Sequence, residues 1–270
     1  MPSILRLLIR NRFGPLLAVL FLFSGCAVRS VYIPVSQNCP LFGPEKELQA
    51  VAYVGANHIE LQGALTPVKN LALIGNLNYG SGISIYEAAV GIYRYSANTR
   101  WRWEAFTGYG YNTNFAYQTA NYNALTNTSV KDYEVQSLYH KYFLQSSFGY
   151  FGEMKMYKIK YSFSFSSRFS AEYFKVYSFK ELDDQATQTS GAPVYIYNIA
   201  YHNSFMYLLE PCITNKVGIK NLSIVLQAQA FFPYSGQIDI RNTVFSPGII
   251  FSAGIQYTMK LKSRGDVSKN

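Results

Sequence analysis

The sequence predicts an all-β chain folded as a closed, antiparallel, up-and-down transmembrane β-barrel of about ten strands, within a range of eight to twelve. Three observations predict it. Charged residues are sparse, at 14%, while aromatic residues reach 17%. No apolar run after Cys26 has the roughly 20 residues that a helical membrane span needs. Several segments instead alternate apolar and polar residues with a period of two, which is typical of strands with one face on lipid and the other in a lumen.

The alternation is clearest in four segments. In residues 155–166, aromatic residues and Ile occupy one parity while Lys and Ser occupy the other, and a helix would mix these classes around its circumference. Residues 101–111, 222–232 and 249–259 repeat the pattern. Weaker alternation predicts six further strands, at 47–55, 58–66, 69–79, 84–94, 138–150 and 203–217. Ten is an even number, as bacterial single-chain barrels require.

Connections of two lengths separate these strands. Turn-forming residues at 66–70, 96–99 and 151–153 predict tight turns. The connections 112–137, 167–202 and 233–247 are long, although parts of the second could extend strands beyond the bilayer. Short turns on the periplasmic side and long loops outside are typical of outer-membrane barrels. A soluble, lipocalin-like barrel with apolar faces turned inward to a ligand cavity stays open as an alternative.

The N-terminus carries a targeting pattern. Three arginines precede a short apolar core at 15–23, and Ser24-Gly25 supplies small residues before Cys26. Residues 22–26, Leu-Phe-Ser-Gly-Cys, resemble the lipobox of bacterial lipoproteins, which implies cleavage before Cys26 and a covalent lipid such as palmitate on its thiol. An ordinary secretory signal with an incidental cysteine is the alternative. Cleavage removes three arginines and no acid, so the net charge falls from +9 to +6.

The chain is therefore expected to have four parts. Residues 1–25 form a lipoprotein signal peptide, and residues 26–46 a lipidated N-terminal periplasmic segment. Residues 47–260 form the barrel, and residues 261–270 a polar C-terminal tail.

The last predicted strand adds independent support. Residues 252–259 are similar to the C-terminal signal that the outer-membrane barrel-assembly machinery reads, with Gly254, Tyr257 and Met259 at its glycine, aromatic and apolar positions. The chain departs from the pattern because it continues past Lys260, whereas many barrels end there.

The mature chain as a whole resembles small outer-membrane β-barrel lipoproteins of the Bacteroidota, most of which have no known activity. The resemblance rests on short stretches in a shared order: Pro40-Leu41 leading to Glu47-Leu48-Gln49, then Glu60-Leu61-Gln62, Phe143-Leu144-Gln145 with Gly149-Tyr150, and Leu209-Glu210-Pro211. In that group, acidic residues after the lipidated cysteine accompany surface export. Here Ala27-Val28-Arg29-Ser30 follows Cys26, so the resemblance implies a lipid on the periplasmic side of a Gram-negative outer membrane.

The expected role is non-enzymatic: structural, envelope-assembly or surface-interaction. Expected partners are outer-membrane lipids, the barrel-assembly and lipoprotein-processing machineries, and an unidentified envelope protein or glycan bound through the long loops. Residues 111–123 favour the last of these, since they combine aromatic rings with Asn and Thr; rings lying in the headgroup belt are the simpler interpretation. A narrow channel or transport component is an alternative.

An enzymatic alternative rests on His202, Ser204 and Glu210. His-x-Ser looks like the motif of outer-membrane lipid A deacylases, and a carboxylate, a histidine and a serine are the residues of nucleophilic acyl transfer. Glu210, however, lies about 20 Å from Ser204 along an extended strand. A deacylase site should also face lipid, whereas Ser204 shares its parity with an inward Glu210. Polar residues at a strand end are the simpler interpretation.

Charged residues at inward positions are expected to pair with one another, because an unpaired buried charge is costly. The candidates are Glu47, Glu60, Glu87 and Glu104 with Arg102, Lys141, Lys158 and Lys160. No cofactor, metal site or nucleic-acid partner is indicated; the three histidines lack metal-ligand spacing with any cysteine pair.

Cys39 and Cys212 remain after lipidation of Cys26. The periplasm permits disulfides, and both cysteines are expected near the periplasmic rim. A bridge between them would tie the N-terminal segment to the base of the barrel.

Overall fold

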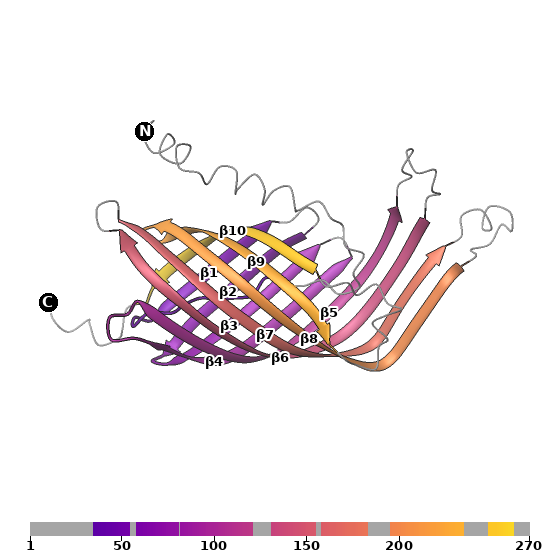
Figure 1. Cartoon of the computed structure of the whole chain (residues 1–270), viewed down its shortest axis with the longest axis horizontal. Coiled ribbons are helices and arrows are strands. Elements are labelled where there is room, and N and C mark those ends of the chain that lie inside the picture. Colours follow the sequence, from indigo (N-terminus) through magenta and orange to yellow (C-terminus); the bar gives the residue numbers. More distant parts are fainter. Residues whose placement is uncertain are drawn as a thin grey trace, which may run out of the picture.

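The computed structural model describes residues 35–54, 58–80, 82–120, 131–154, 158–182, 195–234 and 248–261. In these residues every regular element is a strand, and ten strands form a closed antiparallel barrel (Figure 1). Each strand pairs with its neighbours along the chain, and β10 pairs with β1 to close the barrel. The predicted all-β, up-and-down barrel of ten strands is confirmed. No helix in the described ranges is long and apolar enough to cross a membrane.

The strand bounds are β1 (Glu47–Val54), β2 (His58–Val68), β3 (Leu71–Gly80), β4 (Ile83–Tyr95), β5 (Trp101–Ala120), β6 (Lys131–Met154), β7 (Ile159–Leu182), β8 (Tyr195–Ile219), β9 (Leu222–Tyr234) and β10 (Gly248–Lys260).

One predicted turn is wrong and one is confirmed. Phe151, Gly152 and Glu153 were expected to turn, but they continue β6 and pair with β7, Glu153 opposite Lys160. Phe151 and Glu153 line the turn-end interior of the barrel, and the Tyr161 ring of β7 packs over Gly152. The turn at 96–99 is confirmed: the Thr99 amide donates to the Ser96 carbonyl at 2.8 Å, and the Ser96 amide donates to the Trp101 carbonyl at 2.9 Å.

The barrel has two different ends. At the turn end, short connections join β2 to β3, β4 to β5, β6 to β7 and β8 to β9; β1 begins there and β10 ends there. At the loop end, the connections 121–130, 183–194 and 235–247 leave the described residues. The two tight links β1–β2 and β3–β4 also lie at the loop end.

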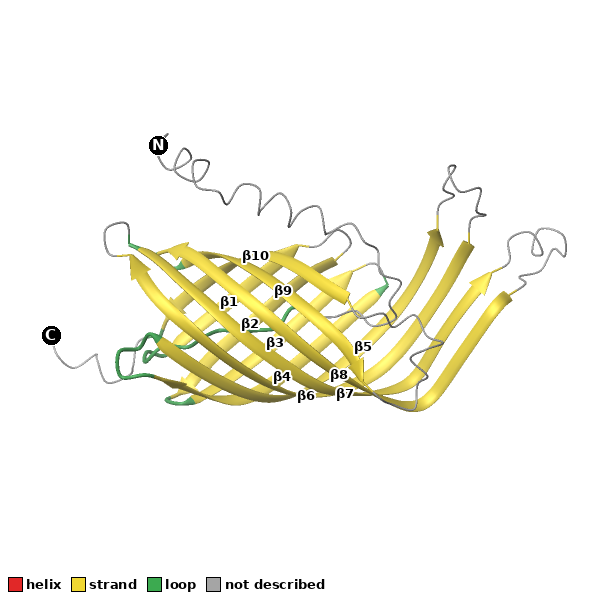
Figure 2. Cartoon of the chain, in the orientation of Figure 1, coloured by secondary structure: helices red, strands yellow, loops and turns green. Residues whose placement is uncertain are grey.

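Strands β5 to β8 are longer than the others and continue past the loop-end rim as a curved sheet (Figures 1 and 2). Much of the predicted connections 112–137 and 167–202 is therefore strand. The β6–β7 ladder shifts register at Leu138/Tyr139, and the β7–β8 ladder passes over Lys175 and Asn203 without a change of register. Asn203 has a φ of 53°, and such bulges bend a strand locally. We call residues beyond this bend the β5–β8 extension.

The two faces of the barrel wall have opposite chemistry. In β7, Phe163 and Phe165 point outward and are about half exposed, while Ser164 and Ser166 point inward and are buried. The same alternation holds around the barrel, where outward positions are mainly Leu, Ile, Val, Phe and Tyr and inward positions mainly Gln, Asn, Ser, Glu and Arg. Apolar faces thus point away from the lumen, which is opposite to the arrangement expected for a lipocalin-like barrel with an apolar internal cavity.

Candidate functional site

Residues Val35–Gly43, here called the plug, lie inside the barrel rather than beside its rim. Every one of them is buried, and Figure 2 shows this segment as a loop that runs through the interior. The sequence analysis assigned residues 26–46 to a periplasmic segment outside the barrel; residues 35–43 instead fill the lumen. Hydropathy alternation gives no signal for such a segment, because it forms neither a helix nor a strand.

Side chains of the wall bind the backbone of the plug. Gln62, Gln227 and Gln145 donate through Nε2 to the carbonyls of Ser36, Gln37 and Asn38, at 2.6, 2.6 and 2.8 Å. The plug has no strand partner, so its buried N–H and C=O groups need such side-chain partners. The polar side chains of the lumen thus have a structural role. The side-chain amides of the wall supply the plug backbone with hydrogen bonds that a neighbouring strand would otherwise supply.

Charged wall residues continue this pattern toward the turn end. Arg102 donates to the carbonyl of Leu41, and Glu104 accepts from the amide of Phe42 at 2.7 Å. Lys216 donates to the Pro40 carbonyl at 3.4 Å. These residues therefore hold the plug, a role that their sequence pattern did not predict.

The plug also packs against the wall. Phe42 is fully buried in a cluster with aromatic and small side chains, and its ring lies 5.4 Å from that of Tyr93. A Cβ added at Gly149 would lie 2.7 Å from the Leu41 side chain, so glycine makes room for Leu41 there. Leu41 has a φ of 55°, a conformation that a non-glycine residue adopts only when its surroundings impose it. Packing against the wall thus holds the plug in one defined conformation.

The plug has a definite direction in the barrel. Ser36 contacts Glu60 and Ser252, which lie near the loop-end limits of β2 and β10. Phe42, by contrast, contacts Glu104, which lies close to the turn-end start of β5. The chain therefore enters the described structure in the loop-end half of the lumen and runs down to the turn end, where β1 begins.

A cluster of buried charges lies in the lumen beside the plug. Lys141 Nζ is 3.2 Å from Glu210, 3.6 Å from Glu87 and 3.8 Å from Glu172. Arg168 Nη1 lies 3.1 Å from Glu87 Oε2. The predicted inward positions of Glu87 and Lys141 and their pairing agree with this arrangement. Arg168 and Glu172 were missed because residues 167–202 were interpreted as a connection.

The side-chain amide of Gln145 links the cluster to the plug. Gln145 Oε1 accepts from Arg168 Nη2 at 2.8 Å, and Gln145 Nε2 donates to the Asn38 carbonyl at 2.8 Å. The Arg168 guanidinium also lies over the Phe143 ring, 4.5 Å from its centroid. Plug, amide and ion pairs therefore form one continuous network across the lumen.

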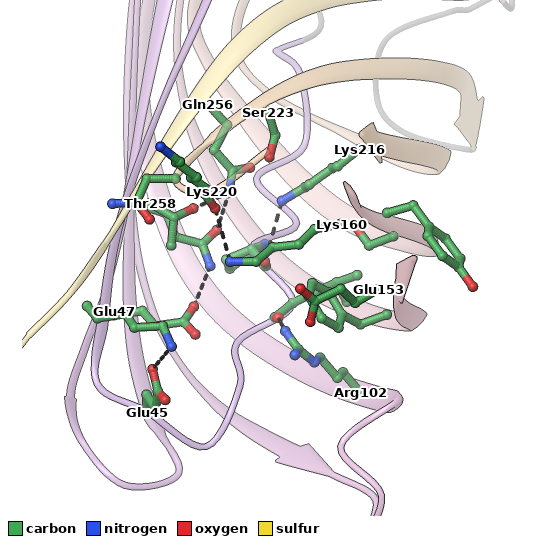
Figure 3. A pocket seen from close by; sticks show the side chains of 18 of the residues that line it. Glu45, Glu47, Arg102, Glu153, Lys160, Lys216, Lys220, Ser223, Gln256 and Thr258 are labelled. Atoms are coloured by element: carbon green, nitrogen blue, oxygen red, sulfur yellow. Dashed lines mark hydrogen bonds and ion pairs between the residues drawn. The ribbon is translucent and has the colours of Figure 1, made fainter. Parts of the chain in front are cut away.

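Below the plug, a polar vestibule opens at the turn end (Figure 3). It has a volume of about 230 Å³, and Pro40, Leu41 and Pro44 form part of its lining. The other lining residues include side chains of both charge signs. The basic ones are Arg102, Lys160, Lys216, Lys220 and Lys260, and the acidic ones are Glu45, Glu47 and Glu153. Lys160 donates to the Lys220 carbonyl at 3.0 Å. Lys158, expected in the lumen, is exposed at the β6–β7 turn with a φ of 52°.

The enzymatic candidates are not arranged as a catalytic set. The Ser204 hydroxyl donates to the backbone carbonyl of His202 at 3.2 Å, and the Asn203 bulge leaves His202 exposed while Ser204 is buried. Glu210 lies in the charge cluster on Lys141. The geometry therefore agrees with a structural role at a bend.

The two cysteines lie deeper than expected. Both were placed near the periplasmic rim, but Cys39 is in the plug and Cys212 is in β8, directly opposite Ser166 of β7. The Cys39 thiol is 3.2 Å from the Ser166 hydroxyl. Both thiols are buried and free in the structure. They thus share one neighbourhood in the lumen, and a bridge between them stays a prediction.

The residues of the C-terminal pattern lie on the closing strand. Gly254 pairs with Tyr53 of β1, and an added Cβ would lie 2.5 Å from the Tyr53 ring. Tyr257 and Met259 point outward, 51% and 39% exposed. Their placement is the one expected of a terminal strand that completes a barrel. Cys26 and the signal peptide lie outside the described residues.

Comparison with known proteins adds no family assignment. No protein-family model matches the chain, and no curated protein is significantly similar to it in sequence.

Proposed function

We propose that this chain is an outer-membrane β-barrel lipoprotein whose lumen is closed by its own N-terminal segment, with a structural, envelope-assembly or surface-interaction role. The observation that carries the proposal is the distribution of side chains: an apolar outer wall encloses a polar lumen that the plug fills. An apolar wall of closed strands is the arrangement that lipid requires, because closure leaves no unpaired backbone edge.

The filled lumen favours a structural or binding role over transport. A barrel of about eight strands is nearly filled by its own side chains, whereas 16 to 18 strands leave an aqueous channel. Here ten strands also contain a plug and the cluster of Glu87, Lys141, Arg168, Glu172 and Glu210. The β5–β8 extension supports contact with a partner, since it presents additional sheet beyond the apolar wall (Figure 1).

Membrane integration is tested by removing the lipid. A chain that begins at residue 27 behind a secretory signal without a lipobox should still fractionate with outer membranes and resist a carbonate wash. It should also migrate faster on gels unheated than after boiling, because a closed barrel stays folded in detergent. Release of this variant by carbonate, with retention of the wild type, would contradict the spanning barrel and favour a lipid-tethered soluble domain.

A further inference from the structure

The direction of the plug in the barrel indicates from which end the chain enters the lumen. Ser36 lies in the loop-end half of the lumen and Phe42 near the turn end, so the plug runs from the loop end toward the turn end. We propose that the N-terminal segment passes through the loop-end mouth of the barrel and that the lipid on Cys26 inserts in the leaflet on that side. This inference rests on the proposed function, which supplies the membrane and the lipid.

Chain length restricts where Cys26 can lie. Eight residues lie between Cys26 and Val35, and the nine Cα–Cα steps, fully extended, span at most about 30 Å. To reach the leaflet at the turn end, this segment would have to leave the loop-end mouth and cross the hydrocarbon outside the barrel. Its backbone groups would be unsatisfied there, at several kcal/mol each.

A return path through the lumen is closed by the plug itself. Its residues bond to wall residues from most of the circumference, namely Gln62 of β2, Glu104 of β5, Gln145 of β6, Ser166 of β7, Lys216 of β8, Gln227 of β9 and Ser252 of β10. A second passage of chain beside it would have to displace these hydrogen bonds. The loop-end leaflet is therefore the one that Cys26 reaches.

This placement is opposite to the one that the residues after Cys26 implied. Long loops of outer-membrane barrels face outward, so the loop-end leaflet is the outer one. The lipid would then lie on the same face as the β5–β8 extension. The anchor and the presented sheet would act together at the cell surface, while Lys260, where β10 ends at the turn end, would face the periplasm.

Three epitope tags in the full-length chain test the inference. One follows Ser30, one lies in the β7–β8 connection after Thr189, and one follows Asn270. Antibody binding to intact cells is compared with binding after the outer membrane is permeabilised. The N-terminal tag should behave as the loop tag, with at least tenfold more binding to intact cells than the C-terminal tag. Gel heat-modifiability of each tagged chain shows that its barrel has folded.

The outcomes separate the inference from the proposed function. An N-terminal tag that follows the C-terminal tag, in a chain whose loop tag is on the opposite side, contradicts the inference alone. Loop and C-terminal tags on the same side contradict the spanning barrel and with it the proposed function. Alkyne-palmitate labelling that is lost in Cys26→Ser reports the lipid; a wild-type chain without label overturns the anchor. A loop tag that faces the periplasm overturns the assignment to the outer leaflet.

Discussion

Arg168 of β7 and Glu87 of β4 form an ion pair inside the barrel, with Nη1 and Oε2 3.1 Å apart and both side chains buried. Lys141 lies 3.6 Å from the same carboxylate. Strands β5 and β6 separate the two elements along the wall, so the pair connects distant parts of one sheet. Such a pair is costly to break because the remaining charge stays buried.

Arg168→Met should therefore destabilise the barrel by about 3–5 kcal/mol, since Glu87 loses one cation and Gln145 loses its donor. The midpoint of urea unfolding, followed by gel heat-modifiability, measures the change. The double variant Arg168→Met/Glu87→Gln should recover part of the loss, because it removes the unpaired charge.

The matched comparison is Lys180→Ala, which removes a half-buried pair with Glu134 in the β5–β8 extension. Its cost should be about 0–1 kcal/mol, as for exposed pairs. Equal losses in Arg168→Met and Lys180→Ala would show that the buried cluster does not stabilise the barrel.

The outer wall offers a second prediction. Ile213 is exposed near the middle of the part of β8 that follows Asn203, and Val54 is exposed at the loop-end limit of β1. Ile213→Arg should cost about 2–4 kcal/mol in a lipid bilayer and lower the yield of assembled barrel, whereas Val54→Arg should cost about 0–1 kcal/mol. Urea unfolding in lipid vesicles measures both. The same cost for both would indicate that this wall does not face hydrocarbon.

The sequence predicted the barrel but not its contents. Strands such as 222–232 and 249–259 could be predicted because the outer wall and the lumen have opposite chemistry, which alternate residues follow. Residues 35–43 escaped prediction because their partners are side chains distant in sequence, such as Gln145 and Gln227. Arg168 escaped because residues 167–202 were interpreted as a connection, whereas β7 continues to Leu182.

The positions of Cys39 and Cys212 predict a disulfide between the plug and the barrel wall. Both thiols lie beside Ser166, and an oxidising compartment could join them. In that reaction two thiols lose two protons and two electrons, which reduce the disulfide of a thiol oxidoreductase to a dithiol. Protein isolated from cells should migrate faster without reductant than with it, and Cys212→Ser should abolish the difference. Maleimide labelling of both thiols in unfolded, unreduced wild-type protein would contradict the bridge.

The plug should control conductance. The wild-type barrel is expected to show no discrete current steps in planar bilayers, because Val35–Gly43 fills the lumen. Deleting residues 27–43, which keeps Cys26, should give small steps: Gln62, Gln145 and Gln227 would then bind water in place of the plug backbone. Conductance should stay small, since Arg168 and Lys141 still project into a narrow barrel. A folded deletion variant that remains silent would show that the charge cluster, rather than the plug, closes the lumen. Steps in the wild type would instead favour the channel alternative.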